Sequence, residues 1–111
     1  MKIQINNNEY NIHFVERKHK KLLMDDEEYH SGATYFIDKE IYIRKDLNPH
    51  SLRYTLIHEI THALIDSYGF LQVDWNDEIV ADFIGNHLPT IGKIYNKIID
   101  DLLKEGYTKH E

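Results

Sequence analysis

Two stretches of alternating apolar and polar residues near the start of the chain predict two β-hairpins. In the first hairpin, the apolar positions lie on either side of an Asn-rich turn at residues 6–8; they are Ile3, Ile5, Tyr10, Ile12 and Phe14. In the second, they flank a short polar turn at residues 38–40; they are Tyr35, Ile37, Ile41 and Ile43. A period of two places apolar side chains on one face of a strand. We therefore expect a small antiparallel sheet built from these two hairpins.

The clearest helix is predicted over residues 49–68. Asn48 is a favourable N-cap, Pro49 suits the first helical position, and Gly69 supplies a C-terminal stop. One face of this helix carries residues at helical spacing: Leu52, Leu56, Ile60, Ala63 and Ser67. The pattern indicates an amphipathic helix that packs on the sheet or on other helices.

Two further helices are predicted behind it. Asn76 is a suitable N-cap for a helix that runs to about His87, just before Pro89. A last helix is expected from about residue 90 to 105, and it would bury Ile91, Ile94, Ile98 and Leu102. Strands followed by helices are typical of an α+β fold, here a single domain over residues 1–111.

Residues 16–32 show the weakest pattern. A basic run at residues 17–21 is followed by an acidic run at residues 25–28. A short helix and an exposed loop fit this segment equally well. We interpret it as a solvated surface whose charges compensate each other, with a partner-docking loop as the alternative.

The composition narrows the classes of function. The chain has 111 residues, of which 41% are hydrophobic, and its 13 basic and 19 acidic residues give a net charge of −6. This balance argues against nucleic acid as an obligate partner. The absence of cysteine excludes disulfides, Cys-based zinc sites and thiol nucleophiles. No segment has the apolar length of a membrane span or the pattern of a signal peptide, so we expect a cytoplasmic protein without a membrane partner.

The sequence His58-Glu59-Ile60-Thr61-His62 is an HExxH motif inside the predicted helix 49–68. Residues four apart lie one helical turn from each other on the same face, so both imidazoles can bind one cation. Zinc accepts neutral His nitrogens readily. Glu59 is offset by about 100° around the helix, where it can take a proton from a metal-activated water. The alternative is that His58 and His62 form an incidental pair, without a metal, at the surface or the edge of the core.

A catalytic zinc site needs a third protein ligand, and Glu78 is the best candidate. Asp82 follows it by four residues, so it faces the same way and suits a hydrogen bond to the outer nitrogen of His58. Glu78 is also explained by an acid in the first turn of a helix, where it favours the dipole. Asp77 and His87 are the competing ligands; Asp77 suits the dipole role better, and His87 lies far along the helix.

Residues 32–87 resemble gluzincin-type zinc metallopeptidases, in which HExxH is followed by a Glu-x-x-x-Asp helix. They are most similar to the small phage-type peptidases of the ImmA/IrrE group and to the minigluzincins. The segments that match are IYIRKDL at 41–47, THAL at 61–64 and EIVADF at 78–83. The resemblance implies a zincin-like fold, one zinc ion held by His58, His62 and Glu78, and Glu59 as general base. It also implies that a strand of the second hairpin lies over the active-site helix and pairs with an extended peptide.

These observations predict a zinc-dependent metallopeptidase that hydrolyses a peptide or protein substrate. A second hypothesis is a latent or non-catalytic zinc protein whose tail, residues 106–111, covers the cleft and offers His110 or Glu111 to the metal. A third is a metal-free interaction module. Four side chains are candidates for stabilising the oxyanion, and the sequence does not rank them: Tyr68, His87, Tyr95 and Tyr107.

Overall fold

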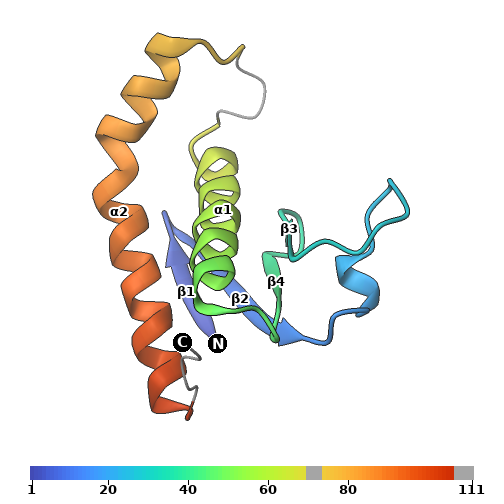
Figure 1. Ribbon diagram of the computed structural model, residues 1–111. Helices are drawn as coiled ribbons and strands as arrows, with labels where there is room; N and C mark the ends of the chain where they lie inside the picture. Colours follow the sequence, from blue (N-terminus) through green and yellow to red (C-terminus); the bar gives the residue numbers. More distant parts are fainter. Residues whose placement is uncertain (70–73, 107–111) are drawn as a thin grey trace.

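The computed structural model describes residues 1–69 and 74–106, which form an α+β fold (Figure 1). In chain order, the elements are β1 (Lys2–Ile5), β2 (Asn8–Val15), the 3₁₀ turn η1 (Lys20–Leu22), β3 (Gly32–Tyr35), β4 (Glu40–Arg44), α1 (Pro49–Ser67) and α2 (Asp77–Lys104). Both helices and the sheet contribute to one hydrophobic core. The predicted fold class is therefore confirmed in its coarse form, whereas the sheet and the number of helices need correction.

The sheet is mixed rather than antiparallel. Its four strands have the order β1-β2-β4-β3, and β2 pairs with β4 in parallel, with Ile12 opposite Ile41 and Phe14 opposite Ile43. Each hairpin is antiparallel by itself, as the alternating pattern predicts. β4, which carries two fully buried isoleucines, is an inner strand beside β2, while the less apolar β3 is an edge strand.

The turn of the first hairpin lies where the sequence predicts it, whereas the turn of the second is longer than predicted. The first closes through Asn6 and Asn7, and Asn6 adopts φ 55°, a left-handed conformation that Asn tolerates. In the second, β3 ends at Tyr35 and the turn spans residues 36–39. Ile37 therefore lies in the turn and is 96% exposed, so its predicted place in a strand is wrong.

Helix α1 confirms the predicted helix. The Asn48 side chain accepts a hydrogen bond from the Ser51 backbone N–H at 2.8 Å, Pro49 is the first helical residue, and Gly69 follows the end with φ 77°. The buried face includes Leu52, Leu56, Ile60 and Ala63, as predicted.

Helix α2 replaces the two predicted C-terminal helices. It starts after Asn76, whose side chain caps the Ile79 backbone N–H at 3.0 Å, and it continues through Pro89 without a break. Proline inside a helix removes a hydrogen bond and costs roughly 3 kcal/mol. Buried side chains on both sides of the proline offset this cost, since they hold one continuous face against the core: Phe83, Ile91, Ile98 and Leu102.

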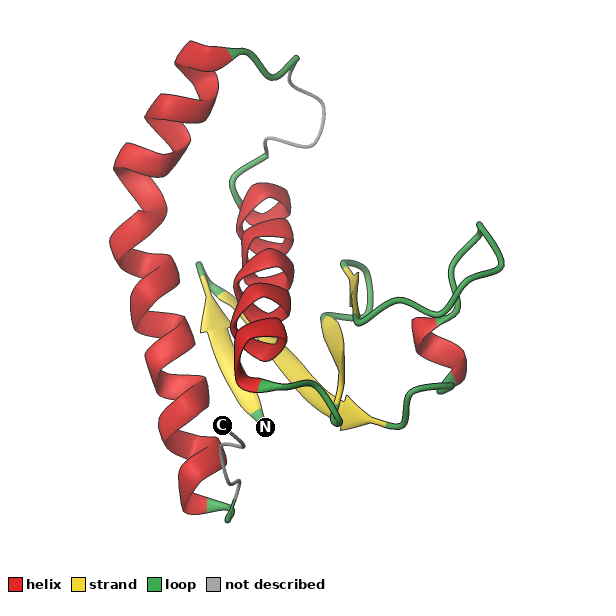
Figure 2. Ribbon diagram, in the orientation of Figure 1, coloured by secondary structure: helices red, strands yellow, loops and turns green. Residues whose placement is uncertain are grey.

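The elements are arranged in layers that leave one side of α1 open. Figure 1 shows the sheet behind α1, α2 running beside α1, and the segment between β2 and β3 projecting from the opposite side. Figure 2 shows that most of this segment is loop apart from η1. The η1 turn anchors this segment to the rest of the fold, because Leu22 is fully buried and the Tyr35 hydroxyl donates a hydrogen bond to the Lys21 carbonyl at 2.6 Å. Neither described helix has the length and apolarity needed to cross a membrane.

Candidate metal centre

His58 and His62 lie on the exposed side of α1, one helical turn apart. Their Nε2 atoms are 3.0 Å apart, so one ring donates a hydrogen bond to the other. Two nitrogens that ligate a tetrahedral zinc at about 2.05 Å would lie about 3.3 Å from each other. The two imidazoles therefore already point their ligand atoms at nearly one place, and this donor pair fits zinc.

Glu59 differs from its two His neighbours because it is buried. It is 5% exposed, although it is a charged residue type and directly follows the exposed His58. One carboxylate oxygen, Oε1, accepts a hydrogen bond from the Thr34 hydroxyl at 2.8 Å, and the other, Oε2, lies 4.0 Å from His58 Nε2. Burying a carboxylate is costly unless hydrogen bonds or charges compensate it, which makes this position unusual for a purely structural residue.

Gly32 creates the space that Glu59 occupies. A Cβ atom at this position would lie 2.7 Å from Thr55 Cγ2, 2.9 Å from Glu59 Cγ and 3.1 Å from Glu59 Oε2. Gly32 and Thr34 are two residues apart, so they face the same side of β3, toward α1. The edge strand β3 therefore packs closely on Glu59 at Gly32, which has no side chain, and donates a hydrogen bond to it from the Thr34 hydroxyl.

The two His residues and Glu59 line a cleft of about 890 Å³. Its walls come from α1, from β3 and from the loop that precedes β3; among the lining residues are Met24, Asp25, Asp26, His30, Thr34, Phe36, His50, Tyr54, His58, Glu59 and His62. Asp25 and Asp26 of the acidic run at residues 25–28 therefore contribute to the wall of the cleft while they remain exposed to solvent. Tyr54 stacks on His58 with ring centroids 5.7 Å apart.

The predicted third ligand lies elsewhere. Glu78, Asp77 and Asp82 are exposed residues of the N-terminal part of α2, and none of them lines the cleft. Among the described residues, no carboxylate joins the two HExxH imidazoles within 4.8 Å. The structure thus brings His58, Glu59 and His62 together, and the assignment of Glu78 and Asp82 stays a prediction.

One other group of ligand atoms is clustered in the described part of the chain. Asp26, Glu28 and His30 place one ligand atom each within 4.8 Å of the others, on the exposed loop before β3. A hydrogen bond with His30 at 2.8 Å lowers the pKa of Asp26 below its ordinary value. Exposed acidic groups like these are common in proteins without a bound metal ion, so the cluster by itself does not indicate a metal site.

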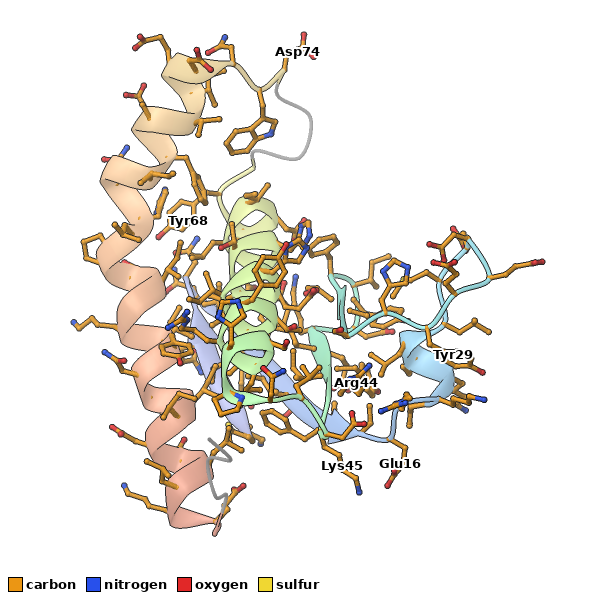
Figure 3. The ribbon with its side chains drawn as sticks, in the orientation of Figure 1. Glu16, Tyr29, Arg44, Lys45, Tyr68 and Asp74 are labelled. Atoms are coloured by element: carbon orange, nitrogen blue, oxygen red, sulfur yellow. The ribbon has the colours of Figure 1, made fainter. Side chains whose placement is uncertain are left out.

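Three candidates for oxyanion stabilisation belong to the described residues, and none of them lines the cleft: Tyr68, His87 and Tyr95. Tyr68 follows the end of α1 (Figure 3), and its ring packs on that of His87 of α2, with ring centroids 4.4 Å apart. Tyr95 is partly buried against the hydrophobic core. Tyr107 and the tail through Glu111 lie outside the described residues.

Sequence reasoning missed three residues around Glu59 and His58. Tyr54 precedes His58 by four residues, so helical spacing provides a signal for it. Gly32 and Thr34 had no such signal, because their role arises from the packing of β3 on α1. Comparisons with protein-family models, with curated proteins and with solved structures gave no match.

Proposed function

We propose that this protein is a zinc-dependent peptidase with one metal ion per chain. The observation that carries the proposal is the HExxH helix itself. Two imidazole nitrogens lie 3.0 Å apart in an open cleft, with a buried carboxylate directly beside them. These features would meet three requirements of hydrolytic chemistry, namely a pair of metal ligands, a general base and room for a substrate.

His58 and His62 are the proposed metal ligands from α1. Glu78, which does not line the cleft in this structure, stays the candidate for the third ligand on the sequence pattern alone. A zinc ion held there would act as a Lewis acid: it would lower the pKa of a bound water to about 7 and polarise a carbonyl. The Glu59 carboxylate is the proposed general base. It accepts a proton from the attacking water and returns it to the nitrogen of the leaving amine, so the peptide bond is replaced by a carboxylate and an amine.

Glu59 is suited to this role by its position. Its Oε2 atom lies 4.0 Å from His58 Nε2, which is beside the His pair and not between the two rings. A base at this place can reach a water molecule at the metal site without occupying a coordination position. The burial of its side chain also limits the directions from which a proton can arrive.

The edge strand β3 suggests how a substrate is held. β3 pairs only with β4 among the described strands, and three of its residues line the cleft beside α1: Gly32, Ala33 and Thr34. An extended peptide can add to such an edge through backbone hydrogen bonds. Its scissile bond would then pass the side of α1 that carries His58 and His62.

Metal content and activity of matched variants test the proposal. Protein purified without chelator or an affinity tag is expected to contain one zinc per chain by elemental analysis, and chelation is expected to lower its melting temperature. Glu59→Gln should retain zinc and the fold and lose cleavage of a peptide library. Protein without zinc, or a Glu59→Gln variant that cleaves like the parent, would refute this function.

Zinc binding without cleavage would favour the alternative of a latent zinc protein. Removal of residues 107–111 then separates the two cases, because a tail that covers the cleft would release activity when it is removed. The same truncation in an active parent should leave cleavage unchanged.

A further inference from the structure

The side of β3 that faces α1 makes a specific contact with the proposed general base. Thr34 Oγ1 lies 2.8 Å from Glu59 Oε1 and 3.4 Å from the Glu59 backbone oxygen. The hydroxyl therefore reaches both the side chain and the backbone of the same residue. Twenty-five positions separate the two residues, so the contact depends on the docking of the edge strand on α1.

We propose that Thr34 is a positioning residue, which holds Oε1 of Glu59 so that Oε2 faces the two His residues. This inference rests on the proposed function, since it assigns a role toward the base of that reaction. A Glu side chain has three rotatable bonds, and a base must stay within hydrogen-bond reach of the proton that it takes. The Thr34 hydrogen bond restricts rotation of the carboxylate, so that its other oxygen stays directed toward the two His residues.

Gly32 completes the restraint from the same strand. Its missing side chain lets β3 approach until the backbone lies against the Glu59 side chain, where a Cβ would come within 2.9 Å of Glu59 Cγ. β-Branched Thr34 is itself restricted in χ1, which favours a fixed hydroxyl direction. The strand thus restricts the Glu59 side chain at two points: Gly32 packs against its Cγ, and Thr34 holds its carboxylate.

The kinetic test uses two substitutions at Thr34 that differ in one group. Thr34→Val keeps the branched shape and removes the hydroxyl, whereas Thr34→Ser keeps the hydroxyl. Thr34→Val is expected to lower kcat and kcat/KM by the same factor, about 10- to 100-fold, because misorientation of the base affects the transition state and not substrate binding. Thr34→Ser should restore most of the activity. Zinc content should be equal in all three proteins.

A second measurement uses the metal-free protein and requires no activity. Thr34→Val should lower the melting temperature in the parent, because it leaves the Glu59 carboxylate without its hydroxyl donor. In a Glu59→Met background, which has no acceptor, the same substitution should have little effect. Equal losses in both backgrounds would show that the hydrogen bond does not couple the two residues, and would overturn the inference.

The outcomes separate this inference from the proposed function. An active parent with an unaffected Thr34→Val variant, or a Thr34→Ser variant as impaired as Thr34→Val, overturns the role of Thr34 alone. A rise in KM with kcat unchanged also overturns it, since that result indicates substrate binding. A parent without hydrolytic activity overturns the proposed function and this role together.

Discussion

Substitution of Gly32 by alanine should destabilise the protein, although alanine usually stabilises a strand relative to glycine. Glycine inside a strand costs roughly 0.5–1 kcal/mol of conformational entropy, so an unhindered Gly→Ala change would be favourable. At Gly32 the new methyl group would lie 2.7 Å from Thr55 Cγ2 and 2.9 Å from Glu59 Cγ. The sign of the effect therefore depends on whether these neighbours can move.

Neither neighbour has room to move easily. Carbon atoms pack best at about 3.5–4.0 Å, so both contacts fall short by at least roughly 0.6 Å. Thr55 and Glu59 are each 5% exposed, and both belong to α1. Overpacking of this kind typically costs about 1–3 kcal/mol. For a domain of this size, that corresponds to a fall in Tm of about 4–12 °C.

Thermal and urea unfolding of metal-free protein measure this change. The matched control is Gly92→Ala in α2, where a Cβ would meet no atom within 4 Å. Because alanine is the better helix former, this control should gain up to about 1 kcal/mol. A Gly32→Ala variant that is as stable as the parent would show that β3 does not press against α1 at this point. If the destabilised variant also loses cleavage at temperatures where it is folded, the displacement of Glu59 accounts for the loss.

Three further predictions concern the core, acid stability and the third ligand. Leu56→Ala should cost about 2–5 kcal/mol in urea unfolding, because Leu56 is 1% exposed, and a near-neutral result would mean that α1 packs by another face. Hydrogen bonds from Arg17 lower the pKa of Asp46, so its contribution to stability is present above the ordinary carboxyl pKa and fades as the pH falls through the lowered value. Urea unfolding should therefore show Asp46→Asn less stable than the parent at pH 7, with a smaller difference in strong acid. In zinc titrations, Glu78→Ala should lose affinity severely while Asp77→Ala keeps it, and the reverse result would refute the ligand assignment.

Local signals were sufficient for α1 and for the direction of its two imidazoles. The cap at Asn48, the stop at Gly69 and the helical spacing of Leu56 and Ile60 all act within a few residues of the chain. Both apolar residues are buried, and His58 and His62 face the cleft, as that spacing predicts. These features need no knowledge of how the rest of the chain folds.

Features that depend on distant contacts could not be predicted in the same way. The parallel pairing of β2 with β4 requires the chain to return over residues 16–39 before β4 docks, and no local pattern encodes that choice. The continuity of α2 through Pro89 violates a local rule, because burial on both sides of the proline outweighs its cost. The burial of Glu59 likewise depends on Gly32 and Thr34, which are far from it in sequence.

The packing of α1 divides the HExxH motif between two environments. Consecutive helical residues differ by about 100° around the axis, so the boundary of the buried face can pass between His58 and Glu59. Leu56 and Ile60 set that boundary, because their burial fixes the rotation of the helix. The same apolar face that stabilises the fold therefore turns the two imidazoles toward the cleft and the carboxylate toward β3. For this reason, the geometry of the proposed base depends on core packing as well as on the residues that contact it directly.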